Sequence, residues 1–258
     1  MKTLYALAPF IRGCTYSCGK GSFVIPAAGG TAAEQLLQSQ RALSVFLAGA
    51  DDSVADSGSA PGRIEERTAA AIREYLDKEG VPPEAVSIEG VGTYAVGTDY
   101  DSTAAAAAGK RTAGGSGEPC SSGKSVIYDR NDVVRNKTAL VTGGAQGFGE
   151  GLVRQLAGAG AAVYIADLNF EGAEKLASEL NAEQGRTAAF PVQVNVADED
   201  SVREMFENVA GTTGGLDICI SNAGVLKAGS VKEISLKDFR FVTDVNYIGY
   251  FLCTKHAS

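Results

Sequence analysis

The sequence predicts an α/β fold, namely an incomplete, doubly wound parallel sheet preceded by a smaller α/β region. Two observations predict it. In the second half of the chain, apolar strand patterns alternate with amphipathic helix patterns, an order that is typical of a parallel sheet with helices on both faces. Before this half, residues 111–135 are rich in glycine and serine, which is typical of a linker. We therefore expect an α/β region over residues 1–110, a linker over 111–135 and the sheet domain over 136–258.

The first region contains two amphipathic helix patterns. Thr31 to Glu34 form a capping box, and the helix that it opens carries apolar residues on one face at Leu36, Leu43, Phe46 and Leu47. The second helix ends at Gly80 and carries a stripe of Ile64, Ile72, Tyr75 and Leu76. Short strands over 85–88 and 90–97, with glycine corners, and an alanine-rich helix that begins near Asp101 complete the region.

The second region alternates strands and helices from its first residues to its last. The expected strands are residues 138–142, 161–167, 188–194 and 216–221. The expected helices are residues 147–159, residues 170–180, a helix that carries Val202, Met205, Phe206 and Val209, and a final helix that Ser235 caps and that carries Phe241, Val245, Ile248 and Leu252. Crossovers between parallel strands should be right-handed.

The most informative motif joins the first strand of this region to its first helix. Residues 142–149 read Thr-Gly-Gly-Ala-Gln-Gly-Phe-Gly. An apolar strand that runs into glycines and then into a helix lets backbone N–H groups and the positive helix end meet a diphosphate with no Cβ in the way. The motif therefore predicts a dinucleotide site.

Asp167 ends the second expected strand, where a dinucleotide-binding fold needs a carboxylate. We expect it to accept hydrogen bonds from the adenosine ribose hydroxyls, and its charge would repel a 2′-phosphate. This favours NAD over NADP. The alternative is an acidic N-cap for the helix at Phe170, for which Asn169 is the better-placed residue.

The spacing Thr142-Gly143-x-x-x-Gly147-x-Gly149, with Asn222-Ala223-Gly224 after the fourth strand, resembles the two signatures of the short-chain dehydrogenase/reductase family over residues 136–258. The resemblance implies a Rossmann-like fold, with Asn195 and Val196 near the adenine. The family usually has Asp where Asn195 stands, but an amide oxygen can still accept from the adenine amino group. The NAD-binding residues expected from the motif and the resemblance are Thr142, Gly143, Gln146, Gly147, Phe148, Gly149, Asp167, Leu168, Asn195, Val196, Asn222, Ala223 and Gly224.

The same resemblance implies a catalytic role for Asn246. In the family an asparagine at this place holds a proton-relay water beside a serine and a Tyr-x-x-x-Lys pair, whose tyrosine is the general acid/base. That serine and that pair should follow a fifth strand, whereas the sequence ends at Ser258, inside the preceding helix. We therefore expect the chain alone to be inactive. A solvated helical asparagine is the plainer alternative.

Composition excludes several other classes of protein. A net charge of -8 argues against a nucleic-acid partner, and one histidine, His256, is too few for zinc hydrolases or His-based triads. Cys14 and Cys18 could hold a soft metal, but no second ligand pair accompanies them, so we expect no metal. The five cysteines suit free thiols in a cytoplasmic protein, and no apolar run is long enough to span a membrane.

We expect the complete protein to be an NAD-dependent oxidoreductase that acts on a secondary alcohol or ketone, with a sugar alcohol or its phosphate as the substrate and a homo-oligomer as the assembly. The alternative is a non-catalytic nucleotide-binding or assembly module. Residues 86–97 with the following helix resemble the end of the aldolase-like part of bifunctional aldolase/short-chain dehydrogenase proteins. That aldolase class uses zinc-binding histidines, which residues 1–110 lack, so this region would be a remnant. An unrelated α/β extension is an equal alternative.

Overall fold

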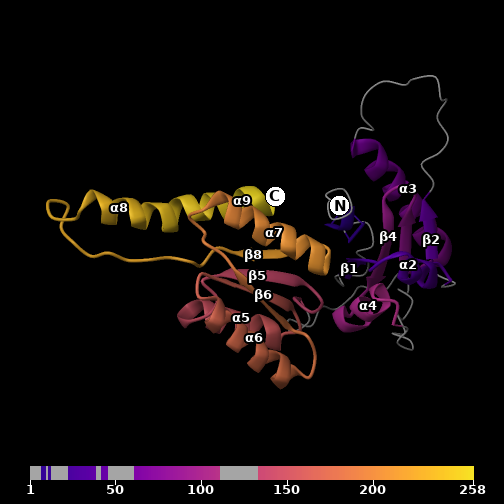
Figure 1. Ribbon diagram of the computed structural model, residues 1–258, viewed down its shortest axis with the longest axis horizontal. Coiled ribbons are helices and arrows are strands. Elements are labelled where there is room, and N and C mark those ends of the chain that lie inside the picture. Colours follow the sequence, from indigo (N-terminus) through magenta and orange to yellow (C-terminus); the bar gives the residue numbers. More distant parts are fainter. Residues whose placement is uncertain (1–6, 10, 13–22, 39–41, 46–60, 111–132) are drawn as a thin grey trace. The chain divides into compact units, whose positions relative to one another are not determined.

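The chain divides into two compact units (Figure 1). The computed structural model describes residues 7–9, 11–12, 23–38, 42–45, 61–110 and 133–258. Unit 1 comprises Met1–Tyr128 with Ala210–Gly215, and unit 2 comprises Asp129–Val209 with Leu216–Ser258. The expected linker lies mostly outside the described residues, as do Cys14 and Cys18.

Unit 2 is built on a parallel sheet in the order β7-β6-β5-β8. Its strands are β5 (Thr138–Thr142), β6 (Ala162–Asp167), β7 (Ala189–Gln193) and β8 (Ile218–Ile220). Register pairs Thr142 of β5 with Ala166 of β6, so the carboxyl ends of the two central strands lie side by side. The predicted parallel α/β fold is confirmed, and the strand order changes direction beside β5, where such sheets bind ligands.

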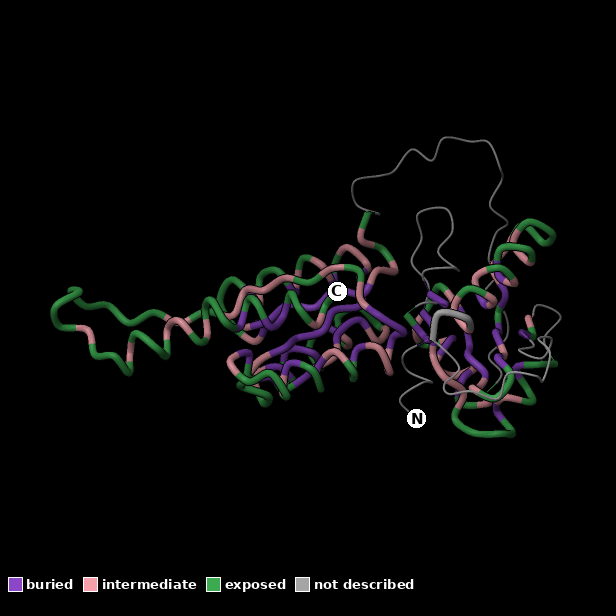
Figure 2. Tube along the Cα trace, turned by 90° about the horizontal axis from the view of Figure 1, so that it is seen from above, coloured by how far each residue is buried: buried purple, intermediate pink, exposed green. Residues whose placement is uncertain are grey.

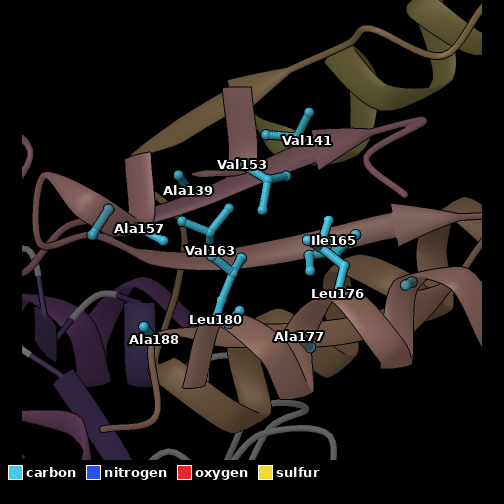
Figure 3. Packing of buried hydrophobic residues seen from close by; sticks show 13 residues of the cluster. Ala139, Val141, Val153, Ala157, Val163, Ile165, Leu176, Ala177, Leu180 and Ala188 are labelled. Atoms are coloured by element: carbon cyan, nitrogen blue, oxygen red, sulfur yellow. The ribbon is translucent and has the colours of Figure 1, made fainter. Parts of the chain in front are cut away.

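Helices cover both faces of this sheet (Figure 1). One face carries α5 (Gly147–Gly158) and α6 (Phe170–Gln184), and the other carries α7 (Glu199–Thr213) and α9 (Gly249–Ala257). Figure 3 shows Val163 and Ile165 of β6 facing Leu180 and Leu176 of α6. Many contacts are made by alanines, which allow the helix backbones to approach the strands closely.

The segment after β8 differs from the rest of unit 2. Figure 2 shows burial along the strands, whereas residues 224–240 contain no buried residue. They lead into α8 (Leu236–Thr243). Ser235 is the N-cap of this helix, and its side-chain oxygen accepts from the Asp238 N–H at 3.0 Å. A π-helical turn, η2 (Asp244–Ile248), joins α8 to α9. The predicted final helix is thus present, with an irregular turn in its middle.

Unit 1 contains a mixed sheet in the order β1-β4-β3-β2. Its strands are β1 (Phe23–Pro26), β2 (Ala42–Val45), β3 (Ala85–Ile88) and β4 (Gly92–Gly97). Its helices are α2 (Gly30–Leu37), α3 (Pro61–Glu79) and α4 (Tyr100–Ala107). Alternate residues of β3 and β4 pack on α3 and on the α2–α4 side, which confirms the predicted strands. Of the predicted stripe on α3, Ile64, Ile72 and Leu76 pack in this core.

The first predicted helix is wrong in two respects. Gly29, not Thr31, is the N-cap of α2, and the helix ends at Leu37. Leu43 lies in β2 instead, because residues 42–45 find a parallel partner in β3. This pairing is a tertiary contact that helical spacing cannot reveal. Phe46 and Leu47 lie outside the described residues.

No helix in the described part of the chain combines the length and the apolar character that a membrane span requires.

Candidate nucleotide-binding site

The turn between β5 and α5 brings backbone amides to the carboxyl edge of the sheet. Gln146 is the N-cap of α5, but its side chain makes no capping hydrogen bond. In contrast, the side chains of Asn169 and Ser235 cap α6 and α8. The first-turn N–H groups of α5, at residues 147–149, therefore have no side-chain acceptor from their own cap, and they carry the positive end of the helix dipole.

The glycines of this turn serve two different purposes. A Cβ on Gly143 (φ 64°) would lie 2.9 Å from the Ala223 Cα, and a Cβ on Gly149 would collide with the carbonyl oxygen of Gly143. At these two positions, neighbouring atoms of the protein leave no space for a side chain. Gly147 also has a positive φ, of 60°, but a Cβ there would have no atom within 4 Å. The surface at Gly147 is therefore open to a ligand, as a diphosphate site requires.

The two sequence signatures, the glycine turn after β5 and Asn222-Ala223-Gly224 after β8, are joined by hydrogen bonds. The N–H groups of Asn222 and Ala223 each donate to the Thr142 Oγ1 at 3.0 Å. The Asn222 side-chain amide donates to the carbonyl oxygens of Thr142 at 2.9 Å and of Gly143 at 3.2 Å. Thr142 is fully buried, so this network fixes the turn between β5 and α5 to the end of β8.

Asp167 lies at the end of β6 and is hydrogen-bonded to the glycine turn. Its Oδ2 accepts from the Ala145 N–H at 3.0 Å, and its Oδ1 accepts from the Asn169 N–H at 2.9 Å. Asn169 is the N-cap of α6, since its side chain accepts from the Gly172 N–H, so the acidic N-cap alternative for Asp167 is wrong. A carboxylate has about four acceptor sites, which leaves capacity for ribose hydroxyls.

Asn195 and Val196 follow β7 on the same edge of the sheet. The Asn195 N–H donates to the Ser201 Oγ at 3.0 Å, and the Asn195 Oδ1 accepts from the Ala197 N–H at 3.1 Å. The Val194 N–H donates to the Asp167 carbonyl oxygen at 3.0 Å. The turn after β7 is thus held against the end of β6, with Asn195 exposed and Val196 buried.

The residues that form this edge are also those that a family comparison matches. Residues 137–258 match the model of the family described as short chain dehydrogenase. This stretch contains the whole parallel sheet and the Thr142–Asn222 network. Over residues 137–258, a little under half of its length, the chain therefore resembles the short chain dehydrogenase family.

Several curated proteins of this type resemble the chain over its second half. It is 41% identical over 121 residues to the uncharacterized oxidoreductase YuxG of Bacillus subtilis, covering 47% of this chain and 18% of that protein. It is 38% identical over 122 residues to meso-2,3-butanediol dehydrogenase of Serratia marcescens, covering 47% of each. It is 34% identical over 123 residues to sorbitol-6-phosphate 2-dehydrogenase of Escherichia coli, covering 48% of each.

Among solved structures, sorbitol-6-phosphate 2-dehydrogenase from Erwinia amylovora matches with 39% identity and a TM-score of 0.45 over 46% of each chain. The chain thus spans about half the length, or less, of the relatives that it matches.

Asn246 lies in the π-helical turn of unit 2, and both the oxygen and the nitrogen of its side-chain amide are hydrogen-bonded. Its Oδ1 accepts from the Val225 N–H at 2.8 Å, and its Nδ2 donates to the Val225 carbonyl oxygen at 2.9 Å. The turn ends where the Gly249 N–H donates to the Asp244 carbonyl oxygen, five residues back. Asn246 therefore holds the segment that follows Asn222-Ala223-Gly224.

The remaining expected site residues flank the glycine turn. Phe148 is 91% exposed and Leu168 is 68% exposed, so two apolar side chains are exposed beside the first turn of α5. Sequence reasoning missed Ala145 and Val225, which act through their backbones, because no side-chain signal marks a backbone donor. It also missed Gly144, where a Cβ would lie 2.9 Å from the Val141 carbonyl oxygen.

Proposed function

We propose that residues 137–258 bind NAD and that the complete protein is an NAD-dependent oxidoreductase of secondary alcohols or ketones. One observation carries the proposal. The glycine turn has uncapped amides and an open face at Gly147, and Asp167 is hydrogen-bonded to the same turn. Members of the family typically use NAD or NADP.

The residues present fit such a cofactor. The amides of residues 147–149 would bind its diphosphate, with the α5 dipole favouring the negative charge. Asp167 would accept from the adenosine ribose hydroxyls with the acceptor sites that Ala145 and Asn169 leave free. Its charge disfavours a 2′-phosphate at that place, which supports NAD over NADP. Asn195 and Val196 would contact the adenine, and Phe148 and Leu168 would cover the bound cofactor.

When bound, the nicotinamide would exchange a hydride with the carbon of the alcohol or ketone. The chain's own residues would bind and orient the cofactor for this exchange. Asn246 would keep the segment after Gly224 in place through its two bonds to Val225. The Tyr-x-x-x-Lys pattern that supplies the proton in the family does not occur within residues 137–258, so these residues would bind NAD without supplying that proton.

The substrate that we propose is a sugar alcohol or its phosphate. The relatives include enzymes named for butanediol, threitol and sorbitol 6-phosphate, each of which carries neighbouring hydroxyl groups. A homo-oligomer and a cytoplasmic location are part of the same proposal.

The experiment is an assay of the product of the full reading frame. The protein should reduce NAD in the presence of a polyol or polyol phosphate, and Asp167→Ala should raise the KM for NAD. Turnover with NADP in preference to NAD, or no nucleotide-dependent turnover with any alcohol, would contradict the proposal.

A second candidate is a non-catalytic nucleotide-binding or assembly module. It is favoured by the apolar residues on the helix around Asn246, since Phe241, Tyr247, Tyr250 and Phe251 are all exposed. NAD binding without turnover by the full reading-frame product, together with self-association through this helix, would support it.

A further inference from the structure

Gly249 is the first residue of α9 and is buried against the turn that follows β7. A Cβ at this position would lie 2.9 Å from the Val196 Cγ2, 3.1 Å from the Val196 Cβ and 3.2 Å from the Val196 carbonyl oxygen. The helix and the turn are therefore in contact with no room for one more carbon. Two of these three atoms belong to the backbone or the Cβ of Val196, so a rotamer change of Val196 could not relieve the contact.

The same helix holds the turn at further points. Leu252 and Cys253 of α9 pack with Val194 and Val196 in one buried cluster. Beyond them, Lys255 Nζ lies 2.5 Å and His256 Nε2 lies 3.3 Å from Glu199 Oε1, where α7 begins. The helix thus lies along the turn from Val194 to Glu199.

The opposite side of the turn is bonded to the sheet. The Val194 N–H donates to the Asp167 carbonyl oxygen, and the Asn195 side chain accepts from the Ala197 N–H. The turn is therefore fixed to β6 at Val194 and packs against α9 at Val196. Asn195 directly precedes Val196 in the chain. Any displacement of the Val196 backbone by α9 therefore also displaces the side-chain amide of Asn195.

A glycine within a helix needs a reason, since it costs about 1 kcal/mol relative to alanine. At Gly151 of α5 a Cβ would meet no atom within 4 Å, so no packing contact accounts for glycine there. At Gly249 the contact with Val196 accounts for it.

We propose that Gly249 is a positioning residue for the adenine of the dinucleotide: by lacking a side chain, it lets α9 set the backbone of Val196 and the amide of Asn195 where the base is recognised. This inference rests on the proposed NAD binding. It assigns a part in base recognition to a residue on a helix that would not touch the cofactor.

The test compares NAD with nicotinamide hypoxanthine dinucleotide, which carries an oxygen in place of the adenine amino group, by calorimetric titration of the 258-residue chain. The wild-type chain should prefer NAD. Gly249→Ala should weaken NAD binding by about tenfold, the factor that corresponds to the loss of one hydrogen bond, and should bring the ratio of the two affinities close to one. Gly151→Ala is the matched control and should change neither affinity nor ratio.

A general loss of stability would lower both affinities together and leave their ratio unchanged, which would overturn the inference. If the wild-type chain binds NAD and Gly249→Ala binds it with the same affinity and preference, the inference fails while the proposed function stands. If the wild-type chain binds neither dinucleotide, the proposed function fails and the inference falls with it.

A second variant covers the case in which Gly249→Ala does not fold. Val196→Ala combined with Gly249→Ala removes the Cγ2 atom that the new Cβ would meet but keeps the contacts at 3.1 and 3.2 Å. The double variant should still discriminate the two dinucleotides less well than Val196→Ala alone. Equal discrimination by these two variants would overturn the inference.

Discussion

Each unit of the chain contains a strand that leads through glycines into a helix with no side-chain cap, yet the two turns differ. In unit 1, β1 leads to α2 through Gly29 and Gly30, and a Cβ on either glycine would have no atom within 4 Å. In unit 2, backbone atoms leave no space for a Cβ at Gly143 and Gly149, whereas a Cβ on Gly147 would have no atom within 4 Å.

Glycines and a helix N-terminus without a side-chain cap do not by themselves make a binding site. The turn in unit 2 is held from two sides, by Asn222 from β8 and by Asp167 from β6, so its amides have a fixed direction. A diphosphate needs such a preorganised set of donors.

Adding one methyl group to each turn should separate them most clearly. In Gly149→Ala the Cβ enters the space of the Gly143 carbonyl group, and we expect a loss of about 3 kcal/mol in the free energy of unfolding of unit 2, as for a badly overpacked core, together with the loss of measurable NAD binding. Gly30→Ala should change stability by less than about 0.5 kcal/mol. Chemical denaturation followed by circular dichroism measures both, and similar costs for the two variants would remove the distinction.

Substitutions of Asp167 should have the next largest effect, because its side chain both favours NAD over NADP and accepts a hydrogen bond from the glycine turn. Asp167→Asn keeps one acceptor oxygen for the Ala145 N–H, replaces the oxygen that accepts from the Asn169 N–H with an NH2 group, and removes the charge. The preference for NAD over NADP should therefore fall by about 10- to 100-fold, the value of a charged hydrogen bond. Asp167→Ala should in addition lower the free energy of unfolding by about 1–2 kcal/mol, because the Ala145 N–H loses its acceptor. Calorimetric titration and denaturation separate the two tasks, and an unchanged preference in Asp167→Asn would refute the first.

The third prediction concerns the two hydrogen bonds by which Asn246 holds the segment after Gly224. Asn246→Ala removes two hydrogen bonds to the Val225 backbone and should lower the free energy of unfolding of unit 2 by about 1–2 kcal/mol. The Val225 amide should also exchange its hydrogen with solvent faster. Thr243→Ala is a suitable control on the same helix, because the Thr243 hydroxyl donates within the helix, to the Phe239 carbonyl oxygen. Equal effects of the two substitutions would show that Asn246 has no special role.

Sequence patterns predicted the sheet of unit 2 well because its strands are short apolar runs and because two of its helices, α6 and α8, begin with capping side chains. The prediction for β5 coincides with the observed strand, and Ser235 caps α8 as expected. The pattern failed in unit 1, where Leu43 fits a helical stripe but pairs as a strand, and where β1 had no recognisable signal.

The site was predicted as a set of residues rather than as a set of contacts. The motif predicted Asp167 and the resemblance supplied Asn246, but not their partners, since Ala145 and Val225 offer only backbone groups that lie far away in the sequence. The contact between Gly249 and Val196 could not be predicted either, because the sequence pattern does not show which apolar residues of different elements lie close together.

The smallest predicted effect concerns pH. Hydrogen bonds from Lys255 and His256, and their charges, lower the pKa of the exposed Glu199 below its usual value. A carboxylate with a depressed pKa in the folded state stabilises that state above its unfolded pKa, and this contribution is lost as the pH falls through the lower, folded value. Wild type should therefore exceed Glu199→Gln in stability at neutral pH, with the difference shrinking below about pH 4. A difference that persists at lower pH would contradict this role.

The most direct measurement for the whole account is a calorimetric titration of the 258-residue chain with NAD and, separately, with NADP. The glycine turn and Asp167 predict binding of one NAD per chain, with NADP at least tenfold weaker because its 2′-phosphate would face the Asp167 carboxylate. Binding of neither nucleotide, or tighter binding of NADP, would contradict the claim that this turn is a site for NAD.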